Sequence, residues 1–229
     1  MDRPIILASA SPRRREFFEL LRLPFRVHST DIDETPRPSE MPDVLVARLS
    51  ATKAATVAQD LLTSVSGRNG ELAEALETGL VVAADTVVVL DDEILGKPLD
   101  ADHAKQMLNQ LRGREHSVYS GVTVVEMESG RAAIHLSTTA VWMREYTEAE
   151  IEAYVSSGDP LDKAGAYGIQ HPGFRPVARI EGCYSGVMGL PLGALVNGLS
   201  HFGVALPVDL ATVCRGRTGH PCCRESDTP

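Results

Sequence analysis

GLVVAADTVVVL, residues 79–90, is a nearly continuous run of apolar side chains. Such a run is typical of a β-strand whose two faces are both covered. Asp85 interrupts the run, and a carboxylate among buried valines costs free energy unless it is paired, hydrogen-bonded or bound to a metal. Buried acids in clefts are often functional, and the alternative is a structural salt bridge. The stretch therefore predicts a central strand and marks Asp85 as a candidate site residue.

The segments on either side of this strand alternate between strands and helices. Further strands are expected at residues 4–8, 25–29, 94–95, 117–125, 133–142 and 175–181. Helices are expected at residues 12–23, 43–58, 101–112, 147–156 and 192–199, from their apolar periodicity and their start and stop signals. Interleaved strands and helices predict an α/β fold.

The first helix begins with a concentration of positive charge. Ser11 is a good N-cap and Pro12 suits the first helical position, which places Arg13, Arg14 and Arg15 in the first turn. Cations there oppose the helix dipole, at roughly 0.3–1 kcal/mol each when exposed. A strand, a serine-rich turn and a helix N-terminus form a ready anion site, and arginine adds bidentate donors, so phosphate is the natural partner. The alternative is that the arginines extend into solvent or pair with the acidic residues at 31–34.

Two lysines add to this cationic group. Lys53 is centred on the apolar side of the helix at 43–58, so its side chain must reach solvent, pair with an acid or meet a ligand. Lys97 lies between Gly96 and Pro98, in a rigid turn just beyond the strand that carries Asp85. Each lysine alone has an ordinary structural explanation, and together with the arginines they indicate a polyphosphate ligand.

A cationic cluster beside a buried acid indicates a particular chemistry. Asp85 could hold a metal or activate water together with a second carboxylate, supplied by Asp31, Asp33 or Glu34. The alternative for residues 31–34 is a solvated turn without a role in the site. The combination indicates metal-assisted hydrolysis of a phosphate ester or anhydride. The sequence contains no Walker A motif, no GxGxxG and no Ser-His-Asp elbow, so those readings have no support.

Composition narrows the class of protein. The chain has 229 residues, 43% hydrophobic and 23% charged, with a net charge of −9. An acidic chain is a poor general ligand for nucleic-acid polymers. No apolar run is long enough for a membrane span and no signal-peptide layout is present, so we expect a cytoplasmic protein. The tail residues Cys214, His220, Cys222 and Cys223 do not match a standard zinc spacing, and an irregular tail is the expected alternative to a metal site.

Five motifs, in order, resemble those of the Maf family of nucleoside triphosphate pyrophosphatases. They are SASPRR (9–14), AADTVV (83–88), GKP (96–98), DKAGAYGIQ (162–170) and GLPL (189–192). The resemblance covers about residues 4–206, and it is the order of the five motifs that makes it specific. It implies an elongated mixed central sheet flanked by helices, with a cleft between two lobes, related to inosine triphosphate pyrophosphatases.

The resemblance also implies an activity. Family members hydrolyse a nucleoside triphosphate between the α- and β-phosphates, giving the monophosphate and pyrophosphate, and need a divalent cation such as Mg²⁺ or Mn²⁺. Asp85 matches the general base of the family, and Glu34 matches an acidic residue at the metal, with Asp85 nearby. The positions that match phosphate-binding residues are Ser9, Arg13, Arg14, Lys53 and Lys97.

The family has branches that differ in substrate. Arg13, Thr86 and Gln170 resemble the specificity residues of the branch that prefers dTTP and UTP, and a glutamine amide can both donate to and accept from a uracil edge. The alternatives are the same chemistry on 7-methyl-GTP or other modified nucleotides, or a nucleotide-binding or division-linked protein without turnover. The resemblance is compatible with a homodimer.

Two stretches depart from the family pattern. Residues 59–79 are small and polar, and we expect an exposed insertion or a loose helix extension there. Residues 208–229 lack periodicity, so we expect one Maf-like domain at 1–207 followed by a disordered tail.

Overall fold

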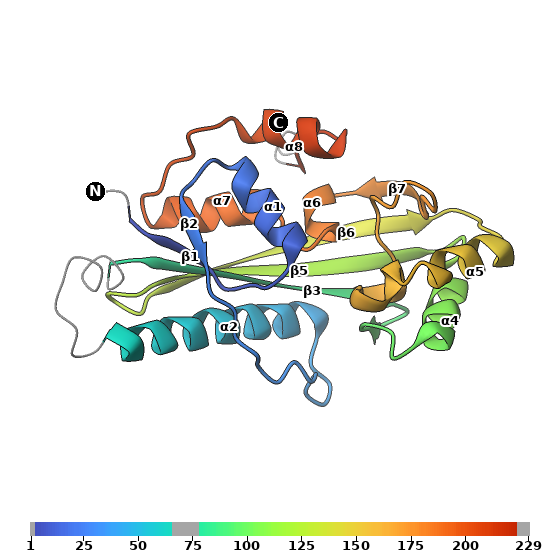
Figure 1. Ribbon diagram of the computed structural model, residues 1–229, viewed down its shortest axis with the longest axis horizontal. Coiled ribbons are helices and arrows are strands. Elements are labelled where there is room, and N and C mark those ends of the chain that lie inside the picture. Colours follow the sequence, from blue (N-terminus) through green and yellow to red (C-terminus); the bar gives the residue numbers. More distant parts are fainter. Residues whose placement is uncertain (1–2, 66–77, 224–229) are drawn as a thin grey trace.

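The central strand of the fold is β3 (Leu80–Leu90), as the apolar run predicts. The structure is a computed structural model that describes residues 3–65 and 78–223. In it β3 lies within a seven-stranded mixed sheet of order β2-β1-β3-β5-β6-β7, with β4 also paired to β3 (Figure 1). The other strands are β1 (Ile5–Leu7), β2 (Phe25–Val27), β4 (Glu93–Leu95), β5 (Glu115–Glu126), β6 (Ala132–Met143) and β7 (Val177–Glu181).

One edge of β3 is shared between two short strands. β1 runs parallel to residues 80–82 of β3, and β4 runs antiparallel to residues 88–90. On the opposite edge β5 pairs antiparallel with residues 80–89, so β3 is held along nearly its whole length. Asp85 and Thr86 therefore lie at the stretch of the first edge between its two partner strands.

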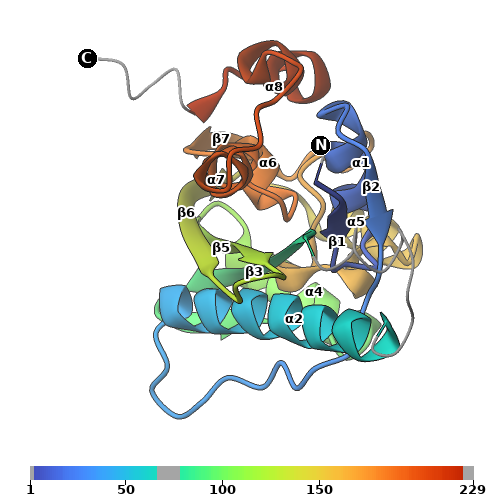
Figure 2. The same cartoon turned by 90° about the vertical axis from the view of Figure 1, so that its left-hand side faces the viewer.

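Helices cover both faces of the sheet, which explains why β3 is apolar except at Asp85 and Thr86 (Figures 1 and 2). α2 (Pro42–Val65) lies along one face. The opposite face carries α1 (Pro12–Leu20), the short α6 (Tyr184–Val187) and α7 (Leu192–His201), and α4 (Ala101–Leu111) and α5 (Glu148–Ser156) lie at one end of the sheet.

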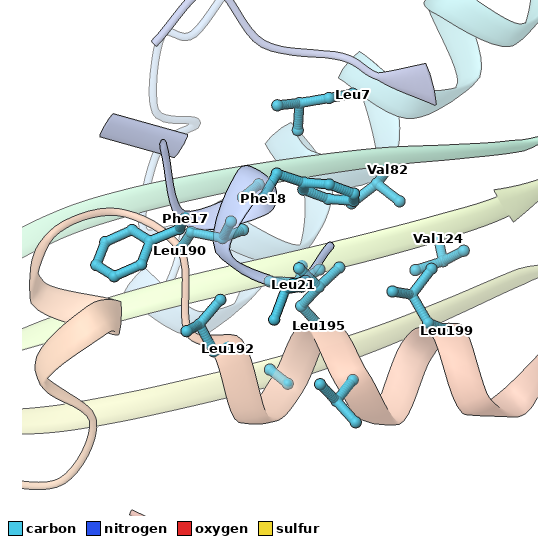
Figure 3. Close-up of a cluster of buried hydrophobic side chains, with 14 of the residues drawn as sticks. Leu7, Phe17, Phe18, Leu21, Val82, Val124, Leu190, Leu192, Leu195 and Leu199 are labelled. Carbon is cyan, nitrogen blue, oxygen red and sulfur yellow. The ribbon is translucent and has the colours of Figure 1, made fainter. Parts of the chain in front are cut away.

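The even-numbered side chains of β3 share one face of the sheet and pack into two separate apolar clusters, which define two lobes of the molecule. Leu80, Val82 and Ala84 belong to an apolar cluster with α1 and α7, part of which Figure 3 shows, whereas Val88 and Leu90 belong to a second cluster with α4 and α5. Thr86 shares this parity and lies at the divide between the two clusters. The odd-numbered residues of β3 pack toward α2, so Asp85 faces that helix.

Most predicted helix boundaries are confirmed, because they are encoded by local hydrogen-bonding signals. Ser11 caps α1 by accepting a hydrogen bond from the Arg14 N–H, and Pro12 is its first residue. Asp100 caps α4, and Thr147 with Glu150 forms the predicted capping box of α5. α2 continues to Val65, so the predicted helix extension exists at least that far. Residues 66–77 of the predicted insertion lie outside the described residues.

The expectation of a fully disordered tail is wrong for residues 210–218, which form α8 (Leu210–Thr218). Asp209 caps this helix and Gly219 ends it in a left-handed conformation. Leu210 and Cys214 are buried against the cluster of α1 and α7. Ala211 and Val213 also pack on this cluster, and Arg217 forms an ion pair with Glu16 of α1 at 2.6 Å. These contacts are with distant segments, so they give no periodic signal in the sequence. The four-residue α6 is too short to give one.

The described residues contain neither a large cluster of metal-binding side chains nor a membrane-spanning helix. Within residues 3–65 and 78–223, no group of three or more His, Cys, Asp or Glu side chains is arranged to hold a metal ion. These residues include the tail up to Cys223. Among the helices of these residues, none has the length and apolar character needed to cross a bilayer.

The approach of α2 to the sheet depends on Gly121, which pairs with Asp85 in the register of β3 and β5. A Cβ at Gly121 would lie 2.6 Å from the carbonyl oxygen of Val46 on α2. Because that neighbour is backbone, Gly121→Ala must displace the helix. We expect a loss of about 1–3 kcal/mol in the free energy of unfolding, measured by urea denaturation.

Gly216→Ala on α8 is the matched control, since no atom lies within 4 Å of the added methyl group. It should be neutral or stabilise the protein, as alanine does in helices. Equal denaturation midpoints for the wild type and Gly121→Ala would contradict this account of the contact between α2 and β5.

Candidate active site

A single cavity of about 450 Å³ lies at the edge of β3 between β1 and β4. All nine residues that the sequence predicts for the site line it: Ser9, Arg13, Arg14, Glu34, Lys53, Asp85, Thr86, Lys97 and Gln170. They come from segments far apart in the chain, from the loop between β1 and α1 to the loop that carries Gln170. Asp85 and Thr86 point to opposite faces of the sheet, and one cavity reaches both because it wraps around the edge between the two short strands.

The loop between β1 and α1 is fixed by its own hydrogen bonds. The Ser11 N–H donates to Ser9 Oγ at 3.2 Å, and Arg14 donates from Nε to the Gly189 carbonyl at 2.8 Å. The second contact ties the start of α1 to the loop before α7. The Ser9 hydroxyl and the N-terminus of α1 are thereby presented to the cavity, an arrangement that suits an anion.

The three arginines of the first turn have different surroundings. Burial lowers the pKa of the Arg14 guanidinium, and the carboxylates of Asp85 and Glu34 oppose this shift. Arg13 reaches Asp162 at 3.4 Å across the cavity. Arg15 is exposed and does not line the cavity. The predicted cationic cluster therefore consists of Arg13 and Arg14, with Arg15 turned away.

Lys53 links two carboxylates. Its Nζ lies 2.6 Å from Asp85 Oδ1 and 2.6 Å from Glu34 Oε1. Lys53 and Asp85 are buried, whereas Glu34 is about half exposed on the loop before α2. The lysine on the apolar side of α2 therefore does pair with acids, and the partner of the buried aspartate is this ammonium group.

The two carboxylates have opposite pKa shifts. Burial raises the pKa of Asp85, and the charge and hydrogen bond of Lys53 offset only part of this effect. Burial also acts to raise the pKa of Glu34, but Lys53, Lys97 and Arg14 together outweigh it and lower the pKa. Asp85 is thus a better proton acceptor than an ordinary aspartate, and Glu34 is more firmly ionised than an ordinary glutamate.

The wall of the cavity near Thr86 is polar. Thr86 Oγ1 lies 2.8 Å from Ser120 Oγ, and Ser120 donates to the Gly186 carbonyl at 3.0 Å. The turn that carries Lys97 is held by a hydrogen bond from the Gly165 N–H to the Gly96 carbonyl. Thr86 and Lys97 are therefore each supported by the segments that close the cavity.

Sequence reasoning missed Asp162 and Lys163, which also line the cavity. Lys163 is buried and its Nζ lies 2.7 Å from Asp162 Oδ1 and 2.9 Å from Asp159 Oδ1. Both residues belong to the DKAGAYGIQ motif, which was the available signal for them. They form an ion-pair network that fixes the loop opposite Arg13.

Tyr167 of the same motif lines the cavity and pairs with a buried histidine. Its hydroxyl lies 2.8 Å from Nε2 of His116. Burial lowers the pKa of His116 to about 4, so the imidazole is neutral at physiological pH. This pair supports the floor of the cavity and adds no charge to it.

The donors around Lys53 fit a divalent cation. Glu34 and Asp85 provide carboxylate oxygens close enough to share one cation, as their common contact with Lys53 shows. Mg²⁺ is usually held by one or two carboxylates together with substrate phosphates and water. Asp31 also lines the cavity, whereas Asp33 does not and instead accepts a hydrogen bond from the Thr35 N–H.

Most of the chain is similar to known proteins. The family described as "Maf-like protein" matches residues 4–202. The "dTTP/UTP pyrophosphatase" of Pelotomaculum thermopropionicum is 41% identical over 199 residues, which cover 87% of this chain and 96% of that protein. The protein of the same name from Nitratidesulfovibrio vulgaris is 47% identical over 210 residues, covering 90% of this chain and 92% of its own. The solved structure of the Staphylococcus aureus Ham1 protein has a TM-score of 0.47 at 12% identity, covering 97% of this chain and 92% of its own.

The opposite pKa shifts predict that the two carboxyls depart from ordinary titration in opposite directions. The pKa of Asp85 should lie above its usual 3.8 because of burial, and that of Glu34 below its usual 4.5 because of the surrounding cations. Carbon-13 NMR of the side-chain carboxyls over a pH titration, assigned with Asp85→Asn and Glu34→Gln, measures both pKa values. A pKa of Asp85 at or below 3.8 would show that burial does not dominate the titration of this residue.

Proposed function

The chain belongs to the Maf family, and we propose that it hydrolyses dTTP and UTP to the nucleoside monophosphate and pyrophosphate. The observation that carries the proposal is that one cavity brings four candidate phosphate-binding cations together with a buried aspartate whose pKa is raised. The relatives named dTTP/UTP pyrophosphatase, at 41% and 47% identity over most of the chain, support this pair of substrates.

The triphosphate is proposed to bind where the cations converge. Arg13 and Arg14 lie at the N-terminus of α1, where backbone N–H groups and the helix dipole also favour an anion. Lys53 and Lys97 approach from α2 and from the turn after β4. Ser9 adds a buried hydroxyl. In this assignment the cations of the first turn are tolerated because their ligand is strongly negative.

Glu34 and Asp85 are the residues proposed to hold a divalent cation, Mg²⁺ or Mn²⁺. When bound, such an ion neutralises phosphate charge and favours departure of the leaving group. Glu34 suits this role because its lowered pKa keeps it ionised, and because it reaches the cavity from an exposed loop.

Asp85 is the proposed general base. Its raised pKa makes it a stronger base than an ordinary aspartate. It would accept a proton from a water molecule whose oxygen forms a bond to the α-phosphorus. The bond between the α-phosphorus and the bridging oxygen breaks, and pyrophosphate leaves with that bond's electron pair.

Recognition of the base is proposed for Thr86 and Gln170, with Arg13 as the third specificity position. Both Thr86 and Gln170 line the cavity, and the DKAGAYGIQ loop is held in place by Lys163. A glutamine amide can donate from its NH2 group and accept at its carbonyl oxygen, which suits the adjacent C=O and N–H groups on the edge of uracil or thymine.

The proposal predicts a selective substrate profile. Pyrophosphate release should be fastest from dTTP and UTP in a panel that also contains CTP, dITP, GTP and 7-methyl-GTP, with Mg²⁺ or Mn²⁺. Preference for 7-methyl-GTP or dITP would keep the chemistry and overturn the assignment of Thr86 and Gln170. Nucleotide binding without release of product from any member would place the protein among non-catalytic binding proteins.

Asp85→Asn should reduce turnover by about 10²–10⁴-fold, the usual contribution of one general base. Asp33→Asn is the matched control, because Asp33 belongs to the same acidic stretch as Glu34 but does not line the cavity. It should retain the wild-type rate. Turnover by Asp85→Asn at the wild-type rate would remove Asp85 from the mechanism.

A further inference from the structure

Lys53 occupies the place between Glu34 and Asp85 where a shared cation would bind. Its Nζ lies 2.6 Å from one oxygen of each carboxylate, so the ammonium uses two of its three donors on the proposed metal ligands. The group is buried, and both contacts are charge-assisted hydrogen bonds. A side chain of the protein itself thus already compensates part of the negative charge of the two acids.

A divalent ion cannot use the same two oxygens while the ammonium remains between them. Mg²⁺ binds oxygen ligands at about 2.0–2.1 Å, closer than Nζ approaches either carboxylate here. The ammonium and the ion would also repel each other across a very short distance in a partly buried site. Metal binding by Glu34 and Asp85 therefore requires Lys53 to move away.

The charge of the cavity as a whole opposes entry of a bare cation. Its lining contains five cationic residues against four acids. The cations are Arg13, Arg14, Lys53, Lys97 and Lys163, and the acids are Asp31, Glu34, Asp85 and Asp162. Asp162 is already engaged by Lys163 and Arg13. A triphosphate reverses this balance, and it also gives Lys53 a new anionic partner in the same cavity.

We propose that Lys53 makes metal binding conditional on the triphosphate. Without nucleotide, its ammonium holds Glu34 and Asp85 together and excludes the divalent ion. With nucleotide, the ammonium moves to the phosphates, which frees both carboxylates for the ion and frees Asp85 from the contact that lowers its basicity. This inference rests on the proposed function and adds an order of binding to it, with Lys53 as a positioning residue.

Binding of Mn²⁺ to the nucleotide-free protein, followed by electron paramagnetic resonance of the free ion, tests the inference without turnover. The wild type should bind Mn²⁺ weakly, and Lys53→Met should bind it about tenfold more tightly or better, because the competing charge between the ligands is gone. Lys97→Met is the matched control. It removes the same charge from the same cavity, but Lys97 has no ion pair with Glu34 or Asp85, so the gain should stay below about threefold.

A second measurement uses only the unmodified protein. Millimolar Mg²⁺ alone should leave the melting temperature nearly unchanged, whereas Mg²⁺ should raise it further once a dTTP analogue with a methylene between the α- and β-phosphates is bound. The inference is overturned if Mg²⁺ alone stabilises the wild type as much as it does with the analogue. It is also overturned if the wild type binds Mn²⁺ as tightly as Lys53→Met, or if Lys97→Met gains as much as Lys53→Met.

Pyrophosphate release by the wild type separates this inference from the proposed function. An active enzyme that binds Mn²⁺ tightly without nucleotide would refute the role of Lys53 and leave the pyrophosphatase intact. A protein without turnover that still shows the Lys53 effect would refute the proposed function and leave the competition between lysine and metal established.

Discussion

The arrangement of this molecule depends on the burial of one carboxylate in its central strand. Asp85 interrupts a strand that is covered on both faces, and it is tolerated because Lys53 on α2 lies 2.6 Å away. Truncating one partner of such a pair leaves an uncompensated buried charge, which is strongly unfavourable. The pair therefore couples the position of α2 against the sheet to the chemistry of the cavity, and the close packing at Gly121 serves the same contact.

The cavity lies at the edge of β3 because two short strands cover only the ends of that edge. β1 and β4 each take one end of that edge, and the two apolar clusters of the lobes meet β3 on either side of Thr86. A cleft placed at this divide can receive side chains from both faces and both lobes. This explains why residues far apart in the chain, such as Ser9 and Gln170, line one cavity.

Much of this was predictable because it is encoded locally. The span of β3, the caps of α1, α4 and α5, and the buried position of Asp85 follow from short stretches of sequence. That Lys53 would contact both Asp85 and Glu34 could not be predicted, because a contact between distant segments depends on packing. The same holds for Lys163 with its acids, and for α8, which packs on a cluster formed by other segments and forms an ion pair with α1.

In the proposed reaction, this cavity delivers water to the α-phosphorus of a nucleoside triphosphate. Hydrolysis of dTTP in water enriched in oxygen-18, with mass spectrometry of both products, tests this step most directly. We expect one labelled oxygen in the nucleoside monophosphate and none in the pyrophosphate. Label in the pyrophosphate would mean attack at the β-phosphorus, and release of labelled orthophosphate would mean attack at the γ-phosphorus. Either result would contradict the geometry assigned to Asp85 and the surrounding cations.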